Sequence, residues 1–240
     1  MWLNQIVADS DSLYDVKTEW DPLEKAGATL RKGDTITLGF DGGRSDDATA
    51  LVAVRVTDGF VQLLHLQEKP SGDEGEGWIV DYAQVDSAVH AAFRDYKVVG
   101  FFADVKMWES YISDWGAAYG EGLEIKSTGG VNAIAWDMRG AMARVTKAHE
   151  LLMGAIKDGK LSHGDLRPQN PWRELNLSLR RHIQNARRRE NAVGVSFGKE
   201  SRESPRKVDA YAALLLAHAA YDEYRQKRKG KPKTGRSWHF

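Results

Sequence analysis

Two apolar runs in this 240-residue sequence end on an aspartate, and this repeated pattern restricts the possible folds more than any other feature. TITLGFD spans residues 35–41 and VVGFFAD spans residues 98–104. Short apolar runs of this kind are typical of buried strands. A crossover helix between two strands can place them in parallel, and ligands in open α/β sheets bind at the carboxyl ends of such strands. We therefore expect Asp41 and Asp104 to lie close together.

The remaining pattern predicts an α/β chain with a mixed sheet. Two further strands are expected at 48–57 and 60–67, joined by an Asp-Gly turn, so that the first three strands form an antiparallel meander. Helices are expected at 79–95, 106–119, 133–158, 172–189 and 205–227, short strands at 123–127 and 192–198, and a loop at 162–171.

Composition and charge restrict the class of protein. There is no cysteine, which excludes disulfides and thiolate metal sites, and no apolar run is long enough to span a bilayer. Residues 1–120 hold 10 basic and 21 acidic side chains, whereas residues 121–240 hold 24 and 13. This division predicts an acidic site that holds divalent cations beside a basic surface that holds phosphates. The alternative is a solvated dipolar surface.

The predicted domain runs from residue 34 to residue 227. Residues 1–33 have weak periodicity and are interpreted as a linker or arm. Residues 228–240 are basic and lack periodicity, so we expect a disordered tail.

A third acid, Asp209, lies near the start of the last predicted helix, for which Ser204 is the expected N-cap and Pro205 the first residue. An acid there could simply stabilise the helix dipole. Carboxylates about 4 Å apart repel by about 4 kcal/mol at an effective dielectric constant near 20. If Asp41 and Asp104 converge, either one carboxylate is protonated or a cation lies between them. Mg²⁺ and Mn²⁺ prefer such oxygen ligands.

Three segments, GFDGGRSDDATAL, FFADVKMWESYISDW and PRKVDAYAALLLAHA, resemble the nuclease domain of the large terminase subunit of tailed bacteriophages. The resemblance covers about residues 30 to 225 and includes LRRHIQNARRR. It implies a ribonuclease H-like mixed sheet, in which an antiparallel three-strand meander and parallel strands are flanked by helices. The acids implied to bind metal are Asp41, Asp104 and Asp209, together with an accessory Asp47, for which the neighbouring Asp46 remains an equal alternative.

By this resemblance the chain is an endonuclease that cuts double-stranded DNA during phage genome packaging. Two divalent ions, Mg²⁺ or Mn²⁺, would act on the attacking and leaving oxygens. Asp41 is expected to bridge both ions, with Asp104 and Asp209 each completing one site. The implied partners are double-stranded DNA, an upstream ATPase domain, the small terminase subunit and the portal protein, and the implied location is the procapsid portal in the host cell cytoplasm. MWLNQIVADSDSLYD resembles the linker that follows the ATPase motor, so the chain is interpreted as an isolated nuclease domain.

Basic residues in the second half of the chain are expected to bind the DNA backbone, which would make binding salt-dependent. The predicted contacts are Arg180, Arg181, His182, Arg187, Arg188, Arg189, Lys199, Arg202 and Lys207. The alternatives are a solvated basic helix for this segment and a structural role for His182.

Other functions share some of these features. A Holliday junction resolvase or a transposase-type nuclease would have the same triad and a different substrate. An actin-like ATP-binding fold would use residues 41–43 as a phosphate loop, but it needs a second glycine-rich loop, for which Gly129-Gly130 follows the wrong element. A non-catalytic DNA-binding packaging protein would bind duplex DNA without metal-dependent nicking.

Overall fold

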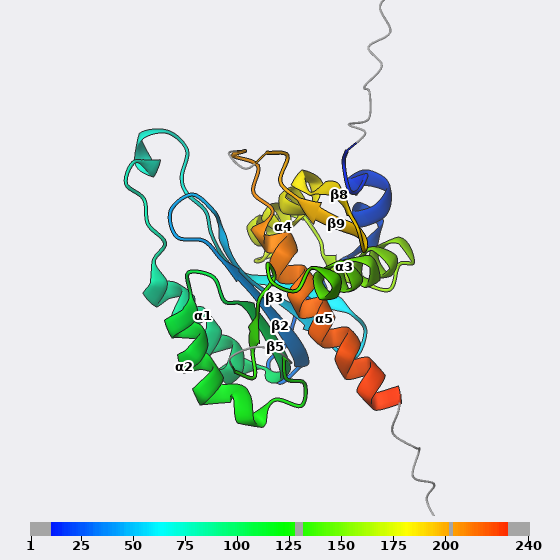
Figure 1. Ribbon diagram of the computed structural model, residues 1–240. Coiled ribbons are helices and arrows are strands. Elements are labelled where there is room, and N and C mark those ends of the chain that lie inside the picture. Colours follow the sequence, from blue (N-terminus) through cyan, green and yellow to red (C-terminus); the bar gives the residue numbers. More distant parts are fainter. Residues whose placement is uncertain (1–10, 128–131, 202–203, 230–240) are drawn as a thin grey trace, which may run out of the picture.

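The structure is a computed structural model that describes residues 11–127, 132–201 and 204–229. In these ranges the chain forms a seven-stranded sheet of order β1-β7-β4-β3-β2-β5-β6 and a separate hairpin, β8-β9 (Figure 1). The strands are β1 (Glu24–Lys25), β2 (Thr35–Gly42), β3 (Thr49–Arg55), β4 (Phe60–Gln67), β5 (Lys97–Asp104), β6 (Ala135–Trp136), β7 (Ser162–Gly164), β8 (Arg187–Asn191) and β9 (Gly194–Gly198).

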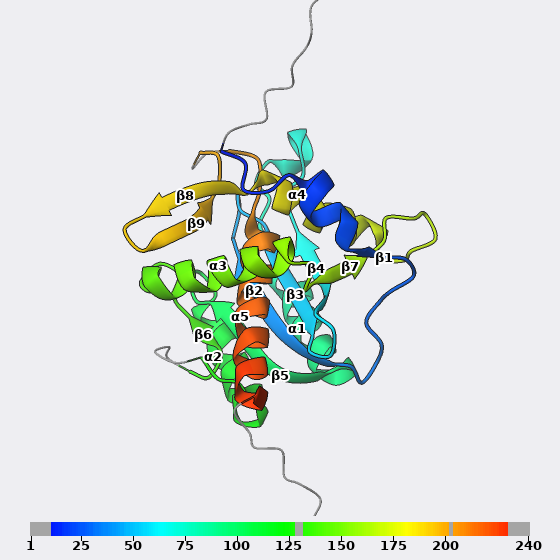
Figure 2. The ribbon, with the colours of Figure 1, turned by 90° about the vertical axis from the view of Figure 1, so that its right-hand side faces the viewer.

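Helices cover both faces of the sheet (Figures 1 and 2). The α-helices are α1 (Tyr82–Asp95), α2 (Glu109–Tyr119), α3 (Met142–Lys157), α4 (Arg173–Asn185) and α5 (Asp209–Lys229), and the short helical turns are η1 (Val16–Trp20), η2 (Asp21–Leu23), η3 (Gly72–Gly75) and η4 (Gly120–Gly122). α1 and α2 pack on one face, and α3, α4 and α5 pack on the other. No helix in the described ranges has the length and apolar character needed to cross a membrane.

The strand pairing confirms the predicted meander and the predicted parallel pair. β2, β3 and β4 are antiparallel neighbours, and β2 pairs with β5 in parallel. Phe40 lies opposite Ala103 in that parallel ladder. The next residues, Asp41 and Asp104, therefore lie at the carboxyl ends of two adjacent strands, on the same edge of the sheet. The whole is the mixed α/β architecture that the sequence predicts.

The sequence suggests residues 1–33 as a linker or arm, and the described part of this segment, 11–33, contributes to the core, mainly on the α5 side. Tyr14 is buried, and its hydroxyl oxygen lies 2.7 Å from that of Tyr211. The buried indole of Trp20 stacks on the ring of His163, with centroids 4.4 Å apart. The segment is thus part of the described fold.

The helix expected at 133–158 begins only at Met142, because local side-chain hydrogen bonds compete with helix formation. The side-chain oxygen Oδ1 of Asn132 accepts hydrogen bonds from the backbone amides two and three residues further along, each at 3.0 Å. The chain then enters β6, a strand too short to leave a periodic signal. The loop expected at 162–171 contains another short strand, β7. The strand expected at 123–127 is reduced to a single bridge between Gly100 and Ile125.

The basic helix expected at 172–189 ends at Asn185, and residues 187–189 lie in β8 instead. The backbone at Ala186 is extended, and β8 then forms a hairpin in which Arg188 lies opposite Phe197. The partner strand decides this outcome, since the arginine run has no apolar spacing of its own.

The last helix begins at Asp209 rather than at residue 205. Ser204 is therefore not its N-cap, and Pro205 is not its first residue. The Ser204 hydroxyl oxygen instead accepts the Arg206 amide at 3.2 Å in a local turn. Of the basic tail expected at 228–240, residues 228 and 229 belong to α5, and the rest lies outside the described residues.

α5 crosses β2, β3 and β5 and lies directly on the backbone of β2 (Figure 2). A Cβ atom on Gly39 would lie 2.0 Å from the Ala213 carbonyl oxygen and 2.3 Å from the Ala217 nitrogen. Two residues earlier on the same face of the strand, the Thr37 hydroxyl donates to the Ala217 carbonyl oxygen at 2.8 Å. The absence of a side chain at Gly39 thus lets this helix approach the strand that carries Asp41.

Replacing Gly39 with Ala is expected to destabilise the protein by about 1–3 kcal/mol, because helix backbone rather than a flexible side chain occupies the added volume. Gly154→Ala is the matched control. Gly154 lies within α3, and its Cβ would meet no described atom within 4 Å, so this change is expected to stabilise by up to about 1 kcal/mol through helix propensity. Urea unfolding in EDTA measures both. Equal midpoints for the two variants would contradict the close packing.

Candidate metal centre

Four acids line one cleft of about 360 Å³ at the edge where β2 and β5 end. They come from four places in the chain. Asp41 and Asp104 lie at the ends of the two strands, Asp209 is the first residue of α5, and Asp47 lies in the loop between β2 and β3. The structure thus brings together the three acids expected from the sequence and one of the two candidates for the accessory acid.

The loop after β2 is tight, which turns Asp47 back toward Asp41. The Gly43 amide donates to the Ala48 carbonyl oxygen at 3.1 Å, and the Trp108 indole donates to the Gly43 carbonyl oxygen at 3.3 Å. A Cβ atom on Gly43 would lie 2.5 Å from the Cβ of Asp47. The loop is therefore closed by its own hydrogen bonds and by close packing of Gly43 against Asp47.

Asp46 and Asp47 point to different surroundings. The Asp46 carboxylate lies 3.0 Å from the Lys69 ammonium, and its side chain is 78% exposed. Asp47 lines the cleft with the other acids, and its charge raises the pKa of both Asp41 and Asp209. The geometry therefore favours Asp47 as the accessory acid.

Burial and mutual repulsion raise the pKa values of the clustered acids. Although part of Asp41 remains open to the cleft, burial is the largest cause of its strongly raised pKa, followed by the charges of Asp209 and Asp104. Burial also raises the pKa of Asp209. It raises that of Asp104 as well, against the opposing effect of a hydrogen bond from the Met138 amide at 3.2 Å. The fold thus holds like charges together in a poorly solvated place.

Two lysines supply positive charge at the side of the cleft. The ammonium group of Lys199 contacts the Asp47 carboxylate, and that of Lys207 lies 3.9 Å from it. Lys199 also lowers the pKa values of Asp41 and Asp209 through its charge. The two lysines therefore offset part of the negative charge of the cluster.

The donor set fits a hard divalent cation. Within the described residues, the buried Oδ2 of Asp209 has no hydrogen-bond partner, and an unsatisfied carboxylate oxygen is costly to bury. The available donors are carboxylates, which suit Mg²⁺ or Mn²⁺. No group of three or more Asp, Glu or His in the described ranges is already arranged to hold a metal. The Asp104 carboxylate accepts a hydrogen bond from the Met138 amide, and the Asp47 carboxylate contacts the Lys199 ammonium. Both carboxylates would therefore have to reorient toward an ion.

The basic residues expected to contact DNA fall into distinct settings. Arg180 forms a two-point pair with Asp21, with distances of 2.7 and 2.8 Å. Arg187 is buried, and Arg181, which is exposed, contacts Glu68. Arg188 forms an ion pair with Glu190, and Arg189 donates to the carbonyl oxygens of Lys199 and Glu200. His182 is fully buried and forms hydrogen bonds with Glu68 and with the Ala210 amide. Arg202 lies outside the described residues.

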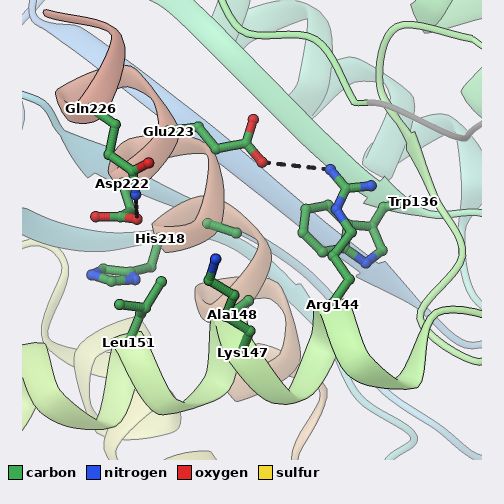
Figure 3. Close-up of a pocket in the computed structure, with 10 residues that line it drawn as sticks. Trp136, Arg144, Lys147, Ala148, Leu151, His218, Asp222, Glu223 and Gln226 are labelled. Atoms are coloured by element: carbon green, nitrogen blue, oxygen red, sulfur yellow. Dashed lines mark hydrogen bonds and ion pairs between the residues drawn. The ribbon is translucent and has the colours of Figure 1, made fainter. Parts of the chain in front are cut away.

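A second hollow, of about 280 Å³, lies between α3 and α5 (Figure 3). The Arg144 guanidinium lies over the Trp136 ring, 3.5 Å from its centroid, and 3.5 Å from the Glu223 carboxylate. Burial lowers the pKa of His218, which also lines the hollow, to about 4. His218 lies nine residues beyond Asp209, or about 14 Å along the helix. The hollow is thus separate from the acidic cleft.

Comparison with known sequences identifies phage relatives. No family model matches the chain. It is 36% identical over 242 residues to the Gene 13 protein of Mycobacterium phage L5 and 36% identical over 247 residues to the Gene 13 protein of Mycobacterium phage D29. These alignments cover 96% and 98% of the chain but only 38% of each relative, so the chain spans less than two fifths of the relatives' length.

Comparison with solved structures identifies the fold. The large terminase nuclease from thermophilic phage G20c matches with a TM-score of 0.51 at 13% identity, covering 79% of this chain and 86% of that one. The same nuclease with bound magnesium matches at 0.50 and 14%, covering 79% and 85%. A large terminase from another thermophilic bacteriophage matches at 0.52 and 10%, covering 87% of this chain and 44% of that one. The chain therefore has the ribonuclease H-like fold of large terminase nuclease domains.

The raised pKa values predict how metal-free stability depends on pH. An acid whose pKa is higher in the folded state than the usual 3.8 contributes stability that is fully present below 3.8 and is lost as the pH rises through the folded-state pKa. In EDTA, Asp209→Asn is therefore expected to leave stability at neutral pH equal or higher, and to weaken its decline with rising pH. Urea unfolding across a pH series measures both effects.

Asp165→Asn is the matched control for that experiment. Asp165 is also buried, but hydrogen bonds from Arg167 and the Gly27 amide hold the pKa of its carboxyl well below its usual range. Its replacement is expected to lower stability at neutral pH. If Asp209→Asn destabilises as Asp165→Asn does, Asp209 is a hydrogen-bonded structural acid and not part of a repelling cluster.

Proposed function

We propose that this chain is a metal-dependent endonuclease that cuts double-stranded DNA, as the nuclease part of a phage packaging machine. The observation that carries the proposal is the meeting of Asp41, Asp104 and Asp209 in one cleft at the carboxyl edge of the sheet. The terminase nuclease fold and the phage origin of the sequence relatives support it. The magnesium bound by the G20c nuclease supports the choice of cation.

The acids of the cleft have separate roles in this proposal. Two divalent ions, Mg²⁺ or Mn²⁺, would supply an attacking water of lowered pKa and stabilise the leaving oxygen. Asp41 is repelled by both Asp209 and Asp104, which supports the proposal that its carboxylate would be the ligand shared by the two ions. Asp104 and Asp209 would each complete one site, and Asp47 would hold an ion or orient a water molecule.

Lys199 and Lys207 would change partner when the site is loaded. Both ammonium groups now lie by the Asp47 carboxylate, and both side chains are 18% exposed. The Lys207 ammonium also donates to the Asp46 backbone carbonyl oxygen. Once bound cations neutralise the acids, the attraction of both lysines to Asp47 falls, and the backbone of the bound DNA offers phosphates in its place. They would then help to position the strand to be cut.

The wider biological setting belongs to the same proposal and follows from likeness to large terminases. An upstream ATPase domain, the small terminase subunit and the portal protein would be the partners. The site of action would be the procapsid portal in the cytoplasm of the host cell.

Supercoiled plasmid incubated with EDTA, Mg²⁺ or Mn²⁺ tests the proposal. Nicking is expected with either metal and not with EDTA. Asp41→Asn is expected to reduce nicking to background, because it removes the carboxylate that would be shared by the two ions. The control is Asp46→Asn, which changes an exposed acid paired with Lys69 and is expected to retain most of the activity. Undiminished nicking in EDTA would overturn the two-metal mechanism.

The DNA structure that the protein prefers to cut distinguishes a packaging nuclease from the alternative functions. Linear duplex, supercoiled plasmid and a four-way junction are compared at equal concentration under the same metal conditions. Efficient cleavage of plain duplex supports a packaging nuclease. A strong preference for the junction would indicate a resolvase, and duplex binding with no cleavage would indicate a non-catalytic packaging protein.

Salt dependence tests the DNA-binding surface with two arginines of the basic segment. Arg188 is exposed on β8, so Arg188→Ala is expected to flatten the slope of log affinity against log salt by about 0.9 if the side chain contacts one phosphate. Arg180 is held at two points by Asp21, so Arg180→Ala is expected to lower stability and leave the slope unchanged. Filter binding over a salt series measures the slope. An unchanged slope for Arg188→Ala would place the phosphate contacts elsewhere.

A further inference from the structure

The start of α5 is fixed by a histidine from another helix. The His182 side chain is fully buried in α4, and its Nδ1 accepts the Ala210 amide at 2.9 Å. The first amides of a helix have no partner within the helix and need an outside acceptor. His182 therefore does for α5 what an N-cap side chain does for other helices.

A carboxylate holds the imidazole in the orientation that this bond requires. Because Nδ1 accepts a hydrogen bond from a backbone amide, the proton of the neutral ring lies on Nε2. Nε2 lies 2.9 Å from Glu68 Oε1 and donates to it. Glu68 directly follows β4 and is also contacted by Arg181. The two hydrogen bonds of His182, one to Glu68 and one from Ala210, thus connect the end of a sheet strand to the first turn of α5.

A second contact from α4 holds the chain on the other side of Asp209. The side-chain amide of Asn185 donates to the Lys207 carbonyl oxygen at 3.0 Å. His182 and Asn185 are three residues apart, which places them on one face of α4. Together they hold residues 207 and 210, with Asp209 between the two points.

Asp209 depends on these backbone contacts because its own carboxylate has few hydrogen bonds that could fix its position. Its buried Oδ2 has no hydrogen-bond partner in the part of the chain that the structure describes. The position of this carboxylate is therefore set mainly by the backbone of residues 207–210.

We propose that His182 is a positioning residue, which holds Asp209 at the metal site by accepting the Ala210 amide. The inference rests on the proposed function, since it concerns a metal ligand of that site. It replaces the phosphate contact expected for His182, because the ring has no exposed surface and both of its nitrogens have protein partners. The predicted consequence of losing the bond is weaker metal binding.

Two substitutions separate the two bonds of the ring. In His182→Asn, the amide oxygen replaces Nδ1 and can still accept the Ala210 amide, but the contact with Glu68 is lost. In His182→Gln, the amide nitrogen replaces Nε2 and can still donate to Glu68, but the acceptor for Ala210 is lost. The two variants are similar in size and polarity, so each is the matched control for the other.

Metal affinity is measured as the rise in melting temperature during a Mn²⁺ titration, with Asp209→Asn as the reference for a lost ligand. His182→Gln is expected to weaken apparent Mn²⁺ affinity by about 10–100-fold, as changes to groups that orient metal ligands commonly do. His182→Asn is expected to stay close to the original protein. DNA binding in EDTA is expected to be unchanged for both. Nicking by His182→Gln is expected to recover when Mn²⁺ is raised, because the acids themselves remain.

Asn185→Asp gives a second route if a buried His182 variant does not fold. Asn185 is only half-buried, and an aspartate of the same shape has no amide to donate to the Lys207 carbonyl oxygen. It is also expected to weaken Mn²⁺ affinity. If the original protein shows a Mn²⁺ shift, equal affinities for His182→Asn and His182→Gln overturn the positioning role, as does an unchanged affinity for Asn185→Asp. If the original protein itself shows no Mn²⁺ shift, the proposed function fails, and the inference falls with it.

Discussion

The close packing of α5 on the backbone of β2 is the contact on which the rest of the structure depends. Gly39 permits it, and Thr37 bonds across it to the Ala217 carbonyl oxygen. From Asp209 to Tyr221 every residue of α5 is buried, so the helix is the centre of the core on its face of the sheet. Its first residue nevertheless carries a carboxylate. The same burial that stabilises the core therefore places Asp209 beside Asp41, where solvation is poor and repulsion is strong.

At one end of a single helix, the closeness of acids that the proposed metal binding requires lowers the stability of the metal-free fold. Asp41, Asp104 and Asp209 would repel one another less if they lay apart, yet strand register and helix packing prevent their separation. Lys199 and Lys207 reduce the conflict in the absence of metal. The bonds from α4 prevent the helix end from relieving it by moving away. A cation that binds three acids of this kind gains affinity from repulsion that the fold has already imposed.

The sequence predicts the parts of this site that have local signals. Asp41 and Asp104 follow uninterrupted apolar runs, and an Asp-Gly turn defines the meander, so the sheet edge and two of its acids are readable from the chain. The helix pattern places Asp209 near a helix start, but its metal-binding role comes only from resemblance. The exact first residue of that helix is missed, because the acceptor for the Ala210 amide is His182, which lies on another helix. Arg188 lies in a strand because Phe197 pairs with it, and a pairing of this kind leaves little trace in local composition. The strands of two or three residues have no period to detect.

The hydrogen bond between Tyr14 and Tyr211 joins two distant parts of the chain near the start of α5. Tyr211 lies two residues after Asp209, in the first turn of α5, and its ring packs edge-on against that of Tyr14. The segment that begins near Leu13 is therefore tied to the helix end that carries an acid of the cleft. The same segment is also bonded to the start of β8, because the Leu13 amide donates to the Ala186 carbonyl oxygen and the Arg188 amide donates to the Asp11 carbonyl oxygen. A displacement of residues 11–14 would therefore be shared between the β8 hairpin and the helix end that carries Asp209.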